Sequence, residues 1–277
     1  DVASKNASGK VQEKAAKTAP QDISPVVPLD TISLELGFSI ITLLDETKGG
    51  NLKERISLVR RDIGLDLGLV VPAIHIQDNI ELEHNEYAFK IKGVEIQRGK
   101  VRTGCLLAMN TGGVTEEISG EKTSDPVFGL PAIWITEENR EKAERLGYAV
   151  VDPATVITTH ITEIIRHNAA DILGRQEVHR IIETLRKDYD AVVSDVEKLN
   201  FTTGHIQKVM QGLLREQVSV RNMVEILETM ADYGAITQNT DILIEKVRQR
   251  LARQISLQYA DGDSRVLHVI TVNPSIL

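Results

Sequence analysis

Residues 148–167, YAVVDPATVITTHITEIIRH, contain the junction that divides this chain into units. The apolar run at 148–151 is typical of a short strand. Asp152 then supplies a hydrogen-bond acceptor for a helix N-cap, and Pro153 fits the first helical position, so a long helix is predicted to begin here. The isoleucines of this helix recur at steps of three and four and predict one apolar face, made of Ile157, Ile161, Ile164 and Ile165.

The sequence before this junction predicts a unit with the element order β, α, β, β, β. Residues 31–40 alternate apolar and polar side chains with the period of two that is typical of a strand. The next apolar residues recur at the spacing of one helix face: Leu52, Ile56, Val59 and Ile63. Strand-like runs follow at residues 70–76, 87–91 and 94–96.

A second group of apolar runs lies between this unit and the junction, and we interpret residues 104–152 as an inserted α/β unit. It contains an apolar run at 105–109, a strand at 131–135 and a charged helix at 136–146, which Gly147 is suited to cap. The first unit is therefore expected to comprise residues 28–103 and to be completed by residues 153–172 of the long helix.

Beyond the junction the apolar spacing is almost wholly helical and predicts a helical subdomain at residues 173–257. Thr203 and Ser219 are expected N-caps, and the last helix is expected to run from 240 to 255. A strand-like run at 266–272 would open a truncated fourth subdomain at 258–277, and the Ala-, Ser- and Lys-rich residues 1–27 predict a flexible linker.

The expected fold class is therefore α+β with several subdomains. A mixed α/β first unit carries a small inserted α/β unit and is followed by an all-helical subdomain.

The composition limits the classes of protein to which the chain can belong. Its 277 residues, 42% of them hydrophobic, are enough for two or three folding units with buried cores. A formal net charge of -8 leaves no basic field for a phosphate backbone, so no nucleic-acid partner is expected. Cys105 is the single cysteine, which excludes an intrachain disulfide and favours a reducing cytosol.

No apolar run approaches the roughly 20 residues that a membrane-spanning helix needs. The chain begins with Asp1, and no signal peptide follows. We therefore expect it to be a piece cut from a longer protein, whose other part could lie in a membrane.

No conventional catalytic motif is recognisable, so the chain is not expected to be an enzyme. His160, Glu163 and His167 share one flank of the long helix at a spacing that suits metal ligands. Helix flanks carry such residues routinely, and we interpret these three as solvated surface. Residues 120–123, GEKT, lack the glycines that shape a phosphate-binding loop. We expect neither a metal nor a cofactor.

The run SDPVFGL at residues 124–130 is a candidate binding site. Pro126 places a rigid turn between the acceptor-only carboxylate of Asp125 and the aromatic ring of Phe128. Pattern alone favours an ordinary turn with Phe128 buried in the core. The alternative is an apolar pocket beside a charge, which suits an amphipathic helix laid into a groove.

Thr159 is a second candidate, because it points away from the isoleucine face of the long helix. The chain enters this helix directly from the inserted unit. Val151, Val156 and Thr159 are therefore placed to line a cleft between that unit and the rest, and clefts between units commonly bind ligands.

Three separated motifs occur in one order: VPAIHIQDN at 71–79, GEKTSDPVFGLPAIWI at 120–135 and LGRQE at 173–177. Together they resemble the cytoplasmic domain of the flagella/invasion type III export-pore family. The resemblance runs from about Leu29 to the end of the chain. The extended match at 120–130 favours the flagellar branch of the family over the virulence branch.

The resemblance implies a membrane-embedded first half, absent here, and a cytoplasmic part of four subdomains that assembles into a nonameric ring. The whole protein would lie in the bacterial inner membrane, with this portion on the cytoplasmic side. A hydrophobic dimple of the family captures export chaperones with their late substrates. Its residues match Asp125, Phe128 and Thr159, to which we add Pro126, Val151 and Val156 as neighbours.

The function implied is that of a docking platform that binds chaperone–substrate complexes and orders their export. The other implied partners are further export-apparatus components, including the ATPase complex, and copies of the same chain. The alternative is a structural ring scaffold of a virulence-type export gate.

Overall fold

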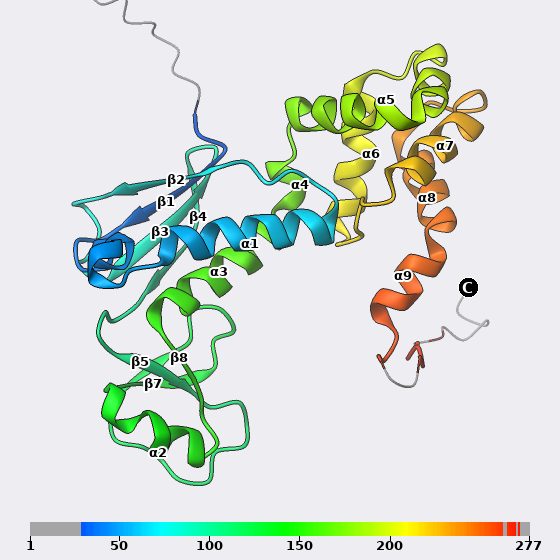
Figure 1. The fold of residues 1–277 in the computed structure, drawn as a ribbon. Coiled ribbons are helices and arrows are strands. Elements are labelled where there is room, and N and C mark those ends of the chain that lie inside the picture. Colours follow the sequence, from blue (N-terminus) through cyan, green and yellow to red (C-terminus); the bar gives the residue numbers. More distant parts are fainter. Residues whose placement is uncertain (1–28, 263–264, 270, 272–277) are drawn as a thin grey trace, which may run out of the picture.

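Two four-stranded sheets followed by a series of helices make up the described part of the chain, and they confirm the predicted α+β fold class (Figure 1). The computed structural model describes residues 29–262, 265–269 and 271. The linker expected at residues 1–27 lies outside these ranges, and the subdomain limits stay predictions. None of the described helices is long and apolar enough to cross a membrane.

The first sheet has the strand order β2-β1-β3-β4. Its strands are β1 (Ile32–Leu36), β2 (Ile74–Asp78), β3 (Glu86–Ile91) and β4 (Val94–Lys100). β1 pairs in parallel with β2, and this pairing needs a crossover. The crossover consists of the short 3-10 helices η1 (Ile40–Leu44) and η2 (Glu46–Lys48), followed by α1 (Leu52–Leu67).

One face of the first sheet carries the main hydrophobic core. Ile32, Leu34 and Leu36 of β1 lie opposite Ile91, Phe89 and Tyr87 of β3, and all six side chains are buried. The helices α1 and α3 (Pro153–His167) lie side by side against the sheet (Figure 1). The isoleucine face predicted for α3 is buried in this core, which confirms the periodicity argument.

The second sheet is antiparallel, with the strand order β6-β7-β5-β8. Its strands are β5 (Leu106–Met109), β6 (Glu121–Ser124), β7 (Pro131–Ile135) and β8 (Ala149–Val151). The short helices η3 (Glu137–Asn139) and α2 (Arg140–Arg145) stand where one charged helix was expected. Ile133 and Ile135 enter a small separate core, whereas Leu107 and Trp134 belong to the main core.

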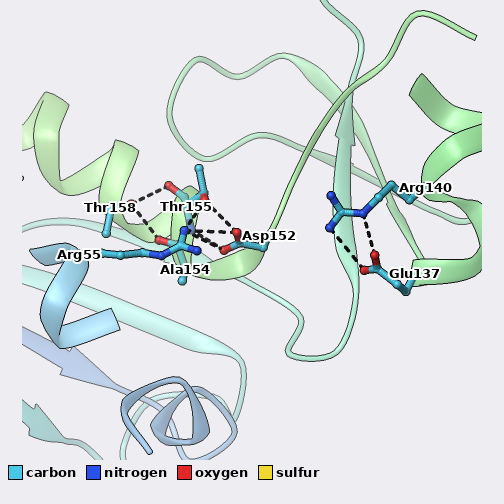
Figure 2. A network of polar contacts seen from close by, with 7 residues as sticks. All are labelled: Arg55, Glu137, Arg140, Asp152, Ala154, Thr155 and Thr158. Atoms are coloured by element: carbon cyan, nitrogen blue, oxygen red, sulfur yellow. Dashed lines mark hydrogen bonds and ion pairs between the residues drawn. The ribbon is translucent and has the colours of Figure 1, made fainter. Parts of the chain in front are cut away.

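The start of α3 is built as the sequence predicts. The Asp152 carboxylate accepts a hydrogen bond from the Thr155 amide at 2.9 Å, and Pro153 occupies the first turn. Figure 2 shows Arg55 of α1 reaching this cap, where it lies 3.2 Å from Asp152 Oδ2 and 2.6 Å from Thr155 Oγ1. The cap therefore also holds α3 to α1. The same view shows a local ion pair between Arg140 and Glu137, beside α2.

The helical part continues from α3 and is joined to the first unit at two places. Its helices are α4 (Ala169–Ile172), α5 (Arg175–Lys198), α6 (Thr203–Arg215), α7 (Met223–Gly234), α8 (Thr240–Arg250) and α9 (Ala252–Tyr259). At one place Lys92 Nζ, at the turn between β3 and β4, donates to the Asp171 carbonyl of α4 at 2.6 Å. At the other the Val220 amide donates to the Leu67 carbonyl at 2.8 Å.

Several local predictions differ from the structure. The N-cap of α6 is Thr202, which forms a capping box with His205, and Thr203 is the first residue of the helix. Ser219 does not cap α7, because its hydroxyl donates to the Asp66 carbonyl at 2.7 Å. The expected last helix is divided at Leu251 into α8 and α9.

The strand expected at 70–76 begins only at Ile74, because the carbonyls of Val71 and Pro72 accept hydrogen bonds from Arg60 instead of a strand. In the run expected as a strand at 266–272, the described residues 266–269 and 271 form no strand. Its other residues lie outside the described ranges.

Candidate functional site

The turn between β6 and β7, residues 125–130, is held by its own hydrogen bonds; we call it the Phe128 turn. The Asp125 amide donates to the Leu130 carbonyl at 2.8 Å, and the Gly129 amide donates to the Asp125 carbonyl at 3.0 Å. The Asp125 carboxylate accepts from the Phe128 amide at 2.7 Å. Gly129 has φ +67, a conformation that favours glycine. These contacts fix the direction in which Phe128 leaves the turn.

The two characteristic side chains of the turn have opposite environments. Phe128 is 61% exposed, whereas Asp125 is only 3% exposed. The interpretation that Phe128 fills the core is therefore wrong, although the turn itself is present. The buried Asp125 carboxylate stabilises the turn through its hydrogen bond, and the Phe128 ring is exposed to solvent.

The other predicted site residues come from β8 and α3. Thr159 and Val151 are half-buried, as is Pro126 in the turn. Val156 is buried in the main core and supports α3 from within. Asp125, Phe128 and Thr159 thus carry accessible or charged groups, while Val156 has a packing role.

A buried histidine of α3 was misinterpreted from the sequence. His160 is 2% exposed, so its assignment to solvated surface is wrong. Its Nδ1 lies 2.8 Å from the Tyr87 hydroxyl, and its Nε2 lies 2.5 Å from Gln97 Oε1. The available signal was its place directly before Ile161 and three residues after Ile157, which puts it beside the apolar face of α3.

The three residues first considered as metal ligands do not converge. Both ring nitrogens of His160 have partners on β3 and β4. His167 is exposed and faces the Glu163 carboxylate at 3.7 Å. In the part of the chain that the structure describes, no group of three His, Cys, Asp or Glu side chains is placed to hold a metal ion.

The buried groups near the Phe128 turn influence each other electrostatically. Burial lowers the pKa of His160, and the negative charge of Asp125 opposes this shift. Burial also raises the pKa of Tyr87, and the charge of Asp125 raises it further. The Asp125 carboxylate therefore lies within electrostatic reach of a neutral imidazole and a neutral phenol.

A cavity of about 440 Å³ is found elsewhere on the second sheet and does not coincide with this site. Its lining includes Val114, Lys122, Ile133 and Tyr148, but not Asp125, Phe128 or Thr159. The arrangement at the Phe128 turn is instead a protruding aromatic side chain on a rigid support. Such a group can anchor a partner that receives the ring.

Comparison with known proteins identifies relatives of this chain. The sequence model of the FHIPEP family matches residues 2–277. The flagellar biosynthesis protein FlhA of Treponema pallidum (strain Nichols) is 55% identical over 271 residues, which cover 97% of this chain and 38% of the relative. FlhA of Bacillus subtilis (strain 168) is 44% identical, over 91% of this chain and 37% of the relative. The chain thus spans well under half the length of these curated relatives.

Solved structures share the fold. The Chlamydia pneumoniae CdsV protein matches with a TM-score of 0.77 and 26% identity, over 93% of this chain and 74% of that chain. CdsV in a complex with CdsO matches with a TM-score of 0.77 and 25% identity, over 92% and 77% of the two chains. The nonameric EPEC SctV-C has a TM-score of 0.65 at 19% identity, over 87% and 70%, and shows the same fold.

Proposed function

The chain belongs to the FHIPEP family, and from this membership we propose that it is the cytoplasmic docking platform of a bacterial flagellar protein export gate. It is a transport component rather than an enzyme. Relatives named as flagellar biosynthesis proteins at 44 to 55% identity favour the flagellar role over a virulence-type export gate. The whole protein would lie in the inner membrane, with this portion on its cytoplasmic side.

The platform captures export chaperones carrying late substrates at the Phe128 turn and the neighbouring part of α3. The observation that carries this proposal is the 61% exposure of Phe128 on a turn locked by the buried Asp125. Burying an exposed phenylalanine side chain contributes about 1.5–3 kcal/mol, so one ring can dominate a small interface. The rigid turn limits the conformational entropy lost on binding.

The remaining site residues shape the surface around this anchor. Pro126 restricts the turn, and Thr159 of α3 and Val151 of β8 are half-buried side chains that we assign to the same surface. Val156 keeps α3 seated in the core and does not meet the partner directly.

Further contacts belong to the assembled export apparatus. The fold shared with CdsV, which has been solved together with CdsO, supports binding of other apparatus components such as the ATPase complex. Self-association into a ring is a further proposed contact, based on the family resemblance.

Calorimetric titration with a flagellar export chaperone bound to its late substrate tests the docking site. We predict that Phe128→Ala weakens binding roughly ten- to a hundredfold, because it removes the anchor that the partner buries. Asp125→Ala should weaken binding as well, because the amide of Phe128 loses its acceptor. Circular dichroism checks that each variant remains folded.

Phe38→Ala is the matched control, because Phe38 is 75% exposed but belongs to the first unit. It should bind as the unaltered chain does. Equal affinities for Phe128→Ala and Phe38→Ala would remove the Phe128 turn from consideration as the docking site.

A further inference from the structure

The strand β6 forms one edge of the second sheet, where the strand order is β6-β7-β5-β8. It pairs with β7 on one side, and among the described residues no strand pairs with its other side. Two hydrogen bonds show which backbone groups face that free side. The Asp125 amide, directly after β6, donates to the Leu130 carbonyl at 2.8 Å. The Pro131 carbonyl of β7 accepts from the Asn110 amide at 2.9 Å, so it points toward β5 and away from β6.

These two bonds determine the register of the edge, because residues of an antiparallel ladder alternate between hydrogen-bonded and non-hydrogen-bonded pairs. Thr123 and Ala132 form a bonded pair, whereas Ser124, opposite Pro131, belongs to a non-bonded pair, and so does Lys122. The N–H and C=O groups of Lys122 and Ser124 therefore point away from β7. Both residues are exposed, and in the part of the chain that the structure describes no other backbone group bonds to them. An added strand would find two donors and two acceptors there.

The cavity of about 440 Å³ lies on one face of this edge. Lys122 is directly opposite Ile133, and both side chains line the cavity together with Val114 and Tyr148. Ile133 and Tyr148 belong to the small core, so the inner wall is apolar. The volume falls in the range of about 300–1,000 Å³ that is typical of ligand pockets. Every second side chain of a strand paired with β6 would face this side, and an apolar one can enter the cavity.

The lining of the cavity carries an excess of negative charge. Glu117 forms an ion pair with Lys122. Glu116 also lines the cavity and is exposed, and no cation of the described residues lies within ion-pair distance of it. A basic side chain on the added strand would therefore be attracted to Glu116. A short, charged edge strand does not by itself favour apolar peptides, so selectivity must come from the cavity and from Glu116.

We propose that the free edge of β6 and this cavity bind an extended polypeptide segment by strand addition, with an aliphatic side chain in the cavity and a lysine or arginine beside Glu116. The backbone hydrogen bonds provide affinity, and the cavity provides selectivity. The source of the segment rests on the proposed function. The Phe128 turn directly continues β6, so a chaperone docked at that turn holds its cargo close to this edge, and we assign the segment to the export substrate.

Methyl NMR with a synthetic peptide tests strand addition without a chaperone. The probe is acetyl-Thr-Val-Thr-Leu-Thr-Lys-Thr-amide, in which valine, leucine and lysine share one face of an extended strand. With isoleucine methyl groups labelled, Ile133→Val assigns the signal inside the cavity. That signal should shift in a saturable way as the peptide is added. Serine in place of the peptide's leucine should weaken binding at least tenfold, because the cavity loses its apolar occupant.

Two N-methylated peptides distinguish strand addition from insertion of a side chain alone. In an antiparallel addition the leucine N–H of the peptide faces β6, and the N–H of the next threonine faces away. Methylation of the leucine nitrogen should abolish binding, and methylation of that threonine nitrogen should change it less than threefold. Equal affinities for the two methylated peptides would overturn strand addition.

Ser124→Pro tests the same edge from the side of the protein. Proline there removes an N–H that faces away from β7, so the pairing of β6 with β7 is kept. Peptide affinity should fall at least tenfold. Ser124→Ala is the matched control, because it keeps the N–H, and it should bind as the unaltered chain does. Glu116→Gln should weaken the lysine peptide about two- to fivefold, as expected for one exposed charge pair. If Ser124→Pro does not fold, the methylated peptides still decide.

A late export substrate without its chaperone should displace the peptide from Ile133. Failure to displace it would overturn the assignment to the substrate. A change of oligomeric state in Ser124→Pro, measured by sedimentation, would make the edge a contact between copies of the chain and contradict the proposal. Peptide binding together with no binding of the chaperone–substrate complex contradicts the docking function alone. Binding of that complex without any peptide binding contradicts strand addition alone.

Discussion

At the scale of single residues, Glu35 shows how a charge is tolerated inside the first sheet. Its carboxylate is buried on β1 and accepts hydrogen bonds from Lys90 Nζ at 2.5 Å and Asn79 Nδ2 at 2.6 Å. Burial acts to raise its pKa, but these hydrogen bonds and the charge of Lys90 outweigh burial and lower it. The carboxylate is therefore ionised in the folded chain and depends on Lys90.

We predict that Lys90→Met lowers the free energy of unfolding by about 3 kcal/mol, because it leaves the buried Glu35 carboxylate without its cation. The double variant Lys90→Met/Glu35→Gln should recover part of that loss, since glutamine carries no charge. Urea denaturation of the two single variants and the double variant at neutral pH measures both effects. If the losses of unfolding free energy in the two single variants simply add up in the double variant, Glu35 does not depend on Lys90.

The lowered pKa of Glu35 also determines how the stability of the folded chain changes with pH. The unfolded carboxyl binds its proton near its ordinary value of 4.5, and the folded one binds it only at lower pH. The contribution of Glu35 to stability is therefore fully present above 4.5 and is lost as the pH falls through the folded value.

At the scale of elements, the end of α1 is locked against the segment before α7. Gly68 has φ +77, and a Cβ added there would lie 2.2 Å from the Arg221 Cα. The hydrogen bond between the Val220 amide and the Leu67 carbonyl holds the two backbones at this distance. Only a residue without a side chain fits this junction between the first unit and the helices.

We predict that Gly68→Ala lowers the free energy of unfolding by about 3 kcal/mol, because two backbones must separate. Gly104→Ala is the matched control: Gly104 also has φ +77, but a Cβ there meets nothing within 4 Å. The Gly104→Ala variant should lose only about 1 kcal/mol of unfolding free energy, from backbone strain alone. Chemical denaturation measures both, and equal losses would show that the contact with Arg221 has no effect.

Elements set by local signals could be predicted from the sequence, and those set by distant contacts could not. Asp152 and Pro153 mark the start of α3 because cap and proline act within one turn. Ser219 failed as a predicted N-cap because its partner, the Asp66 carbonyl, is 153 residues away along the chain. The surroundings of His160 depend likewise on strands β3 and β4, which no helical pattern reveals.

The same distinction applies to the proposed docking site. The turn was predictable from Asp125 and Pro126, whose effects are local. The exposure of Phe128 depends on how the second sheet is oriented, and the periodicity of a seven-residue run does not contain that information.

At the scale of the whole molecule, the second sheet is tied to the first unit through a shared core. Leu107 and Trp134 on one face belong to the main core, and Ile133 and Ile135 on the other enter the small core. The Phe128 turn joins two strands of this sheet, so it is held in a defined place relative to α3. This fixed placement supports the docking role that we propose for the region.

Hydrogen–deuterium exchange of the chain, alone and saturated with a chaperone–late substrate complex, tests the docking claim most directly. The account predicts new protection of residues 125–130 and of the middle of α3 around Thr159 in the complex. Unchanged exchange at the Phe128 turn, with protection confined to α5–α9 or to the first sheet, would contradict it.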